Sequence, residues 1–222
     1  MNASTLECPA ADAAHPEVQR QSAKLVEHAR DETEKARILF EFVRDSIAYT
    51  FSWRRDEAED EPLPIASFRA SATLHRGSGM CIQKAVLLCA LSRAAGLQVR
   101  LAFQSLRDYR LPRELVALMG DVLTPHGLVA VRINGRFVRL DPSLDRSLCE
   151  RKGYRLTEFS ATEDALLPSL DVNGKRHFEV LEELGEFDSF PTDFVMSIFA
   201  KRFGELDVEA VRAYIARTGA TM

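Results

Sequence analysis

The sequence has few cysteines and no long hydrophobic run. Its 222 residues include cysteines only at positions 8, 81, 89 and 149, with no Cys-x-x-Cys pair and no Cys/His set at zinc-finger spacing. We therefore expect neither a disulfide scaffold nor a metal site, and no cofactor. No stretch approaches the ~20 apolar residues of a membrane-spanning helix, so no membrane partner is expected.

The chain also lacks an excess of positive charge. It has 29 Lys and Arg against 33 Asp and Glu, which gives a net charge of −4. Proteins that bind nucleic acid usually carry a basic patch, whereas the arginines here are scattered, so no nucleic-acid partner is expected. The first thirty residues show neither the basic nor the apolar segment of a secretory signal. These absences predict a cytoplasmic protein.

The composition is that of an ordinary globular domain. Hydrophobic residues make up 46% and charged residues 28% of the chain, which is close to the usual values. A chain of this length can bury a core without disulfides. No repeat, low-complexity tract or linker divides it, so we predict a single domain over residues 1–222.

Local signals predict elements along the chain. A helix is expected near Pro16, and another after Asp31, which can cap it with Glu34 as the return half of a capping box. "IAYTF" indicates a short strand, and the charged stretch 54–64 a solvated loop. A strand is also expected over "QVRLAFQ" and a helix over part of "PRELVALMG". Near the C-terminus we expect a hairpin around "DVNGKRHFEVLEEL", then two helices, the last running from an Asp207 cap to Thr218 and Gly219.

The stretch "RGSGMCIQKAVLLCALSRAAGL" places Cys81 after a glycine-rich turn and at the start of a helix that is apolar nearly all round. This helix should be central, buried and closed by Gly96. A cysteine in a first helical turn is favoured as thiolate by the helix dipole and by free N–H groups. The N–H groups of Gly79, Met80 and Cys81 could also receive an oxyanion. Taken alone, however, such a cysteine is more often a small core residue.

A hairpin signal stands downstream, in "PHGLVAVRINGRFVRLDP". Two alternating runs flank Asn134-Gly135, the pair favoured in a type I′ turn. With these two loop residues, Leu128 faces Asp141, and His126 lies diagonally from Asp141 on the same face, about 7 Å away between backbones. The register therefore predicts a contact between His126 and Asp141. The opposite face should enter the core with Val129, Val131, Ile133, Val138 and Leu140.

These residues suit nucleophilic acyl transfer. In that chemistry a thiolate attacks a carbonyl, a histidine exchanges protons, and a carboxylate fixes the imidazole tautomer and stabilises its charged form. The chain offers Cys81, His126 and Asp141 for the three roles.

The joint pattern resembles the transglutaminase-like superfamily, whose members share a papain-like cysteine-enzyme core. The family carries G-x-C before an Ala- and Leu-rich helix that ends R-A-x-G, here "GMCIQKAVLLCALSRAAG". It also carries a histidine that opens a strand and an aspartate that closes the next strand ahead of proline, here "HGLVAVRINGRFVRLDP". The preceding "EKARILFEFVRDSIAYTF" is similar to the family's lead-in helix.

By this resemblance Cys81 matches the nucleophile, His126 the general base and acid, and Asp141 the orienting carboxylate. The implied fold is α+β: a papain/transglutaminase-like core whose central helix, carrying the cysteine, packs against an antiparallel β-sheet, with additional N- and C-terminal helices. The implied core spans about residues 31–145, with 146–222 as a C-terminal extension packed on it. The sequence shows neither the large flanking β-domains of animal transglutaminases nor a calcium-loop pattern, so it resembles a small stand-alone microbial-type member.

Further residues are secondary candidates. His75 and Gln83 lie close enough in sequence to shape the site around Cys81. Cys89 is turned by about 80° from Cys81 around the helix and is expected in the core. The remaining assignments are Gln104 and Arg107 as cleft-lining residues, Cys8 and Cys149 as incidental thiols, and His28 and His177 as surface residues.

We therefore expect a cysteine enzyme that acts on a peptide, protein or small amide substrate through a thioester. Hydrolysis is preferred over amine transfer because no second substrate platform is evident. One alternative is an arylamine N-acetyltransferase-like acyltransferase, although "RGSGMC" is one residue longer than that family's R-G-x-x-C turn. The other is a non-catalytic module, since the family commonly has an aromatic and an acidic residue where this chain has Leu128 and Ala130.

Overall fold

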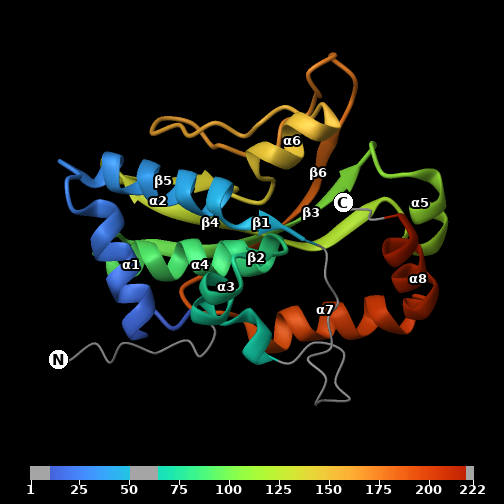
Figure 1. Cartoon of the computed structure of the whole chain (residues 1–222), viewed down its shortest axis with the longest axis horizontal. Coiled ribbons are helices and arrows are strands. Elements are labelled where there is room, and N and C mark those ends of the chain that lie inside the picture. Colours follow the sequence, from blue (N-terminus) through green and yellow to red (C-terminus); the bar gives the residue numbers. More distant parts are fainter. Residues whose placement is uncertain (1–10, 51–64, 219–222) are drawn as a thin grey trace.

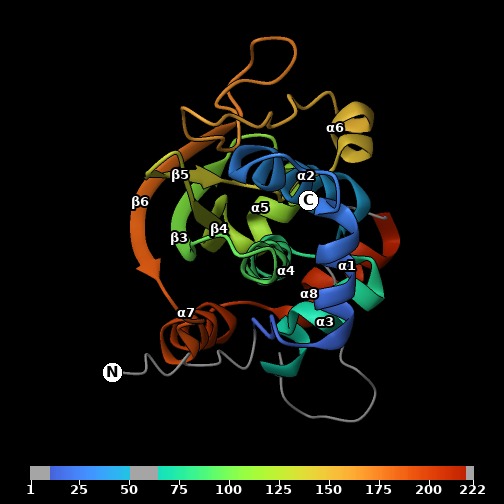
Figure 2. The same ribbon diagram turned by 90° about the vertical axis from the view of Figure 1, so that its left-hand side faces the viewer.

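The computed structural model describes residues 11–50 and 65–218, in which most helices lie on one side of an antiparallel sheet (Figures 1 and 2). The helices are α1 (Pro16–Val26), α2 (Glu32–Ser46), α3 (Ala70–Arg76), α4 (Cys81–Ala94), α5 (Arg113–Met119), α6 (Arg146–Lys152), α7 (Thr192–Gly204) and α8 (Val208–Thr218), with a 3-10 turn η1 (Ile65–Phe68). The strands are β1 (Ala48–Tyr49), β2 (Ser78–Gly79), β3 (Val99–Asp108), β4 (Val122–Ile133), β5 (Arg136–Leu140) and β6 (Phe178–Phe187). Cys8, Gly219 and the predicted loop 54–64 lie outside the described residues.

The main sheet has the order β5-β4-β3-β6, and its neighbouring strands are antiparallel. The β4–β5 hairpin has the predicted register, with Ile133 paired to Arg136 and Val129 paired to Leu140. Asn134 and Gly135 have φ values of 51° and 84°, as a type I′ turn requires. A separate parallel pair, β1 with β2, links Tyr49 to Gly79 just before α4. The α+β architecture predicted from the sequence is confirmed.

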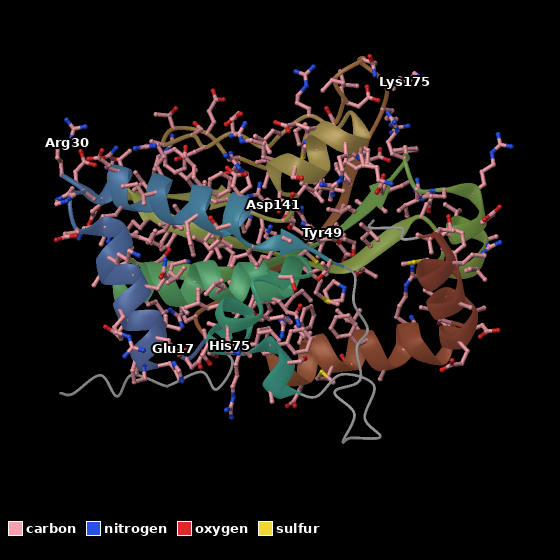
Figure 3. All side chains as sticks on the ribbon, viewed as in Figure 1. Glu17, Arg30, Tyr49, His75, Asp141 and Lys175 are labelled. Carbon is pink, nitrogen blue, oxygen red and sulfur yellow. The ribbon has the colours of Figure 1, made fainter. Side chains whose placement is uncertain are left out.

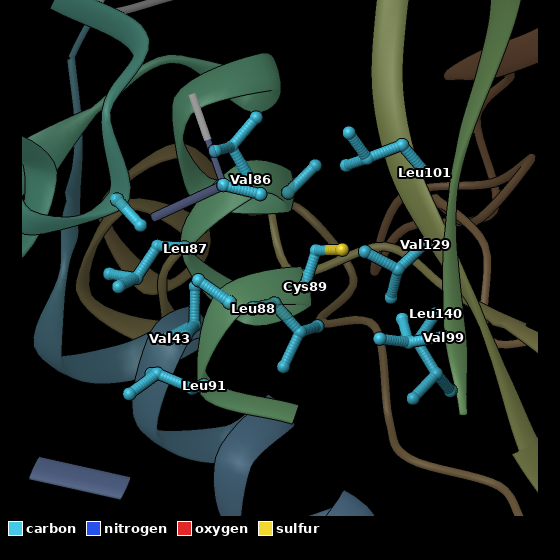
Figure 4. Packing of buried hydrophobic residues seen from close by; sticks show 14 of the residues in the cluster. Val43, Val86, Leu87, Leu88, Cys89, Leu91, Val99, Leu101, Val129 and Leu140 are labelled. Atoms are coloured by element: carbon cyan, nitrogen blue, oxygen red, sulfur yellow. The ribbon is translucent and has the colours of Figure 1, made fainter. Parts of the chain in front are cut away.

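Helix α4 is the centre of the core. All its residues from Ile82 to Ser92 are buried, because α1, α2 and α3 pack on one side and β3 and β4 on the other. The Cys89 side chain points from α4 toward Leu101 and Val129 of the sheet (Figure 4), which confirms its place in the core. Gly127 allows the close approach, since a Cβ there would lie 2.8 Å from the Ile82 Cα. The absence of this one Cβ brings the start of α4 against β4.

The N-terminal half follows the sequence signals with one correction. The Asp31 side chain accepts from the Glu34 N–H at 2.8 Å and caps α2 as predicted. Glu34, however, accepts from the backbone N–H of Arg30 at 3.0 Å. The return half of the predicted capping box therefore goes to the residue before the cap.

The C-terminal part differs more from expectation. Only an isolated bridge, Leu170 to Arg176, stands where the hairpin was predicted, and the second run continues as β6, which pairs with β3. The prediction that His177 is at the surface is wrong, because it is 0% exposed. The two final helices are confirmed, and Asp207 caps the last one by accepting from the Ala210 N–H at 3.0 Å. No described helix is long and apolar enough to cross a bilayer.

Candidate active site

Cys81 is the first residue of α4 and is partly exposed. The chain reaches it abruptly: Gly77 ends α3 with φ 68°, β2 follows for two residues, and Met80 is an extended N-cap. The sulfur therefore stands at the positive end of a buried helix, where the first N–H groups have no intrahelical acceptor.

His126 and Asp141 meet as the hairpin register predicts. His126 Nε2 lies 2.6 Å from Asp141 Oδ2, and the two residues are only 3% and 0% exposed. The other carboxylate oxygen accepts from both the backbone N–H, at 3.0 Å, and the hydroxyl of Ser143. The carboxylate is thus held by three contacts. Sequence reasoning missed Ser143, although "DPS" after a strand is a typical Asx-turn signal.

The pKa of His126 is raised to about 10. Burial lowers this pKa, but the negative charges of Asp141 and of a Cys81 thiolate outweigh burial, helped by hydrogen bonds to both side chains. Because Nε2 is used by Asp141, Nδ1 is the ring nitrogen left for Cys81. The ring therefore bridges sulfur and carboxylate, and its environment favours imidazolium at neutral pH.

Tyr49 is a site residue that the sequence did not reveal. It is 7% exposed, and its pKa is raised well above the usual value by burial and by negative charge at Cys81, then at Asp108 and Asp141. The phenol therefore stays protonated beside the thiol. Its backbone N–H donates to Asp145 Oδ2 at 2.8 Å, and the same carboxylate caps α6.

A buried lysine on α4 helps to hold Tyr49 in place. Lys84 is 0% exposed, and its Nζ donates to the carbonyls of Arg44 at 3.0 Å and Ile47 at 2.6 Å. Burial lowers its pKa to about 7. Since these carbonyls end α2, Lys84 fixes the start of β1, and so the place of Tyr49, relative to α4.

The other predicted site residues have different surroundings. Gln83 Oε1 accepts from the Met80 N–H at 3.0 Å, and its Nε2 donates to the Ser67 carbonyl at 2.9 Å. The Met80 N–H is therefore occupied, which leaves the Cys81 N–H as the stronger oxyanion candidate. Gly79 packs against Gln83, whose Cβ would be 3.0 Å from an added Cβ. His75 is exposed at the end of α3, apart from Tyr49 and Asp141 (Figure 3).

A cavity of about 60 Å³ opens beside Cys81. Its lining is largely apolar and comes from segments far apart in the sequence: Tyr49, Met80, Met119, Val122, Leu123, Thr124, Pro125, Phe199, Arg202 and Leu206. Arg202 Nη2 donates to the Met119 and Val122 carbonyls, the latter at 2.7 Å. Helix α7 thereby closes the cavity, which sequence patterns alone did not indicate.

The thiol site stands without a metal-ligating set nearby. Across residues 11–50 and 65–218, no three His, Cys, Asp or Glu residues are grouped so as to hold a metal ion. What the arrangement offers is a cysteine at a helix N-terminus and a buried His–Asp pair from an antiparallel hairpin. This combination defines the papain-like class of α+β folds.

Comparison with protein families identifies the family within this class. A sequence model described as the transglutaminase-like superfamily matches residues 19–142, which is more than half of the chain. The chain therefore belongs to the transglutaminase-like superfamily. Among curated proteins, no relative matches the sequence.

Two solved structures are similar in part. A candidate cysteine protease from Cytophaga hutchinsonii is 16% identical with a TM-score of 0.43, and the match covers 60% of this chain and 38% of that one. A candidate protease from Parabacteroides distasonis is 15% identical with a TM-score of 0.40, and the match covers 61% and 25%. The match thus spans less than half the length of each of these two solved structures.

Proposed function

We propose that the chain is a cysteine-dependent acyl-transfer enzyme that hydrolyses amides through a thioester on Cys81. The observation that carries this proposal is the buried 2.6 Å contact of His126 with Asp141, with the remaining ring nitrogen facing Cys81. In this role His126 is general base and acid, and Asp141 orients and stabilises its charged form.

The reaction needs two proton transfers by the same imidazole. The Cys81 thiolate attacks the amide carbonyl while His126 carries the proton. The tetrahedral oxyanion can accept from the Cys81 N–H, with the Tyr49 hydroxyl as a second candidate donor. His126 then gives its proton to the leaving nitrogen, the C–N bond breaks, and a thioester remains. Water, deprotonated by His126, attacks the thioester, the C–S bond breaks, and a carboxylic acid leaves.

The cavity beside Cys81 supports a preference in the acyl group. Its apolar lining and volume of about 60 Å³ suit a small apolar side chain next to the scissile carbonyl. Arg202 is the one charged side chain among the described residues of this lining, and it already donates to two backbone carbonyls. The lining therefore offers little to bind an acidic or basic substrate side chain. We propose peptide or small amide substrates with such a side chain.

A substrate panel tests the proposal. Peptide amides with Ala, Val, Asp or Lys before the scissile bond are incubated with the full chain, with and without a primary amine. We expect free acid as the main product, fastest for Ala and Val, and no product with Cys81→Ala, whereas Cys149→Ala behaves as wild type. A product that carries the added amine would make the protein a transferase. Activity that survives Cys81→Ala would contradict the proposal.

One further arm distinguishes the acyltransferase alternative. An acyl-CoA thioester and an arylamine replace the peptide in the same assay. Acetylation of the arylamine with no hydrolysis of peptide amides would support an N-acetyltransferase-like activity. No turnover in either arm would favour a binding module that retains the fold.

A further inference from the structure

A second, larger cavity lies away from Cys81, between β3, β6 and the chain at 166–176. Its volume is about 610 Å³, within the range of about 300–1,000 Å³ that is usual for ligand sites. Six apolar side chains line it: Leu106, Leu166, Leu167, Leu170, Phe178 and Val180. Leu170 and Val180 are 43% and 41% exposed, so the apolar rim is open to solvent.

One polar side chain in the wall lacks a partner. Gln104 is 0% exposed, and among the described residues neither its Nε2 nor its Oε1 has a hydrogen-bond partner. A buried amide without partners costs free energy, so a purely structural role does not explain it. The side chain offers donors and an acceptor side by side. Gln104 therefore holds a donor and an acceptor that no other described residue uses.

An extended peptide residue matches this group. Its N–H and C=O point to the same side of the chain, as they do where two strands exchange a pair of hydrogen bonds. The Gln104 Oε1 can accept from that N–H while Nε2 donates to the C=O. At the rim, Arg176 and Glu179 form an ion pair, in which Arg176 Nη2 lies 2.7 Å from Glu179 Oε1. Because their charges cancel, the groove does not require a charged ligand.

We propose that this groove binds an extended, uncharged peptide segment with an apolar side chain, whose main chain pairs with Gln104. The groove lies beside the candidate catalytic histidine, because Gln104 pairs with His126 across β3 and β4 and paired side chains share a face of the sheet. Leu167 and Phe178 separate it from a cavity of about 10 Å³ that contains His126. Ala165, just before the chain over the groove, bridges to Leu140 at the end of β5, and Leu170 bridges to Arg176 within that chain.

NMR on the full chain carrying Cys81→Ala tests binding without turnover, and so independently of the proposed catalysis. The probe is N-acetyl-leucine N-methylamide, which is titrated while the Gln104 side-chain amide resonances are followed. We expect these resonances to shift on saturation. N-acetyl-N-methyl-leucine N-methylamide lacks the required N–H and should bind roughly tenfold more weakly, and the glycine analogue should also bind more weakly. Equal affinity for all three probes would overturn the proposal.

Protein variants complete the test. Gln104→Leu should weaken binding of the leucine probe by about tenfold or more while leaving the unfolding temperature unchanged or raised. The matched control is Gln98→Leu, just before β3, where the exposed Gln98 accepts from Arg132 at 3.0 Å; it should bind as the parent does. Leu170→Asp, at the exposed rim, should also weaken binding and does not depend on a core substitution. Unchanged binding in Gln104→Leu or in Leu170→Asp would contradict the proposal, and a lowered unfolding temperature in Gln104→Leu would show a structural glutamine instead.

Discussion

Two buried histidines in this protein lie near aspartates, yet their environments shift the two imidazole pKa values in opposite directions. His126 Nε2 is 2.6 Å from Asp141 Oδ2, and its pKa is raised to about 10. His177 Nε2 is 3.6 Å from Asp108 Oδ1, too long for a hydrogen bond, and its pKa is lowered to about 4 by burial and then by the positive charge of Arg110.

The neighbours of the two rings explain the difference. His177 packs between aromatic rings, with centroid distances of 4.2 Å to Tyr154 and 3.8 Å to Phe178, and neither of its ring nitrogens has a hydrogen-bond partner among the described residues. It behaves as a neutral aromatic spacer. Burial alone therefore disfavours a charged imidazole, and only a carboxylate in direct contact, together with the Cys81 thiolate, reverses that effect.

The largest expected difference is in catalysis. His126→Gln should lower kcat/KM by ~10²- to 10⁴-fold, the usual contribution of a general acid–base residue. His177→Phe keeps an aromatic ring and should leave kcat/KM nearly unchanged. Steady-state kinetics on the best substrate of the panel measures both. Similar losses in the two variants would mean that the comparison does not separate a catalytic from a structural histidine.

The next difference is in the pH dependence of kcat/KM. If protonated His126 is the active form, activity falls as pH rises through its pKa of about 10. Asp141→Asn removes the negative charge that raises this pKa, so the alkaline limb should move toward the ordinary histidine value of about 6.5. Asp108→Asn should leave the limb in place. A limb that does not move in Asp141→Asn would contradict the role of this carboxylate.

Stability should depend on pH with opposite signs for the two histidines. The pKa of His126 is raised on folding, so its contribution to the free energy of unfolding is fully present below pH ~6.5 and is lost as pH rises through about 10. The pKa of His177 is lowered to about 4, so the unfolded chain binds more protons between that value and ~6.5, and stability rises with pH there.

Urea unfolding between pH 4 and 7 checks the acid side. His177→Phe should remove a destabilisation on the order of 1–3 kcal/mol at the acid end. Asp108 acts in the opposite direction, because burial raises its pKa to about 6, and the same substitution leaves that effect in place. If wild type and His177→Phe keep parallel pH profiles, His177 is not the buried neutral base described above.

The smallest expected effect concerns the support of Asp141. Ser143→Ala removes the hydroxyl that donates to Asp141 Oδ1 and should lower the free energy of unfolding by about 1 kcal/mol. It should also move the alkaline limb in the direction of Asp141→Asn, but by less. Ser169→Ala, at an exposed position, serves as control. An unchanged limb would show that Ser143 supports the fold and not the pKa of His126.

Local sequence signals were sufficient for the elements that carry the candidate triad. The Asn134-Gly135 turn fixed the register that brings His126 to Asp141, and the apolar run after Cys81 predicted a buried helix. Each rests on short-range chemistry: a turn that needs positive φ at two residues, and a helix whose apolar residues face every side. The catalytic roles of the three residues stay predictions until the variants are measured.

Long-range contacts could not be predicted in the same way. Nothing near Tyr49 in the sequence shows that β1 pairs with β2 and brings the phenol to Cys81. Likewise β6 pairs with β3 across more than sixty intervening residues in the chain, which is why the expected hairpin was wrong and His177 is buried. The single-domain prediction stays a prediction.

Selective alkylation of Cys81 tests the central claim, the functional coupling of Cys81 to His126, most directly. The full chain is treated with limiting iodoacetamide at pH 7, and the modified cysteines are located by mass spectrometry. We predict that Cys81 reacts first, that the buried Cys89 and Cys149 react last, and that His126→Gln slows Cys81 while His177→Phe does not. Labelling spread evenly over the cysteines, or a Cys81 rate that is the same in His126→Gln, would contradict the account.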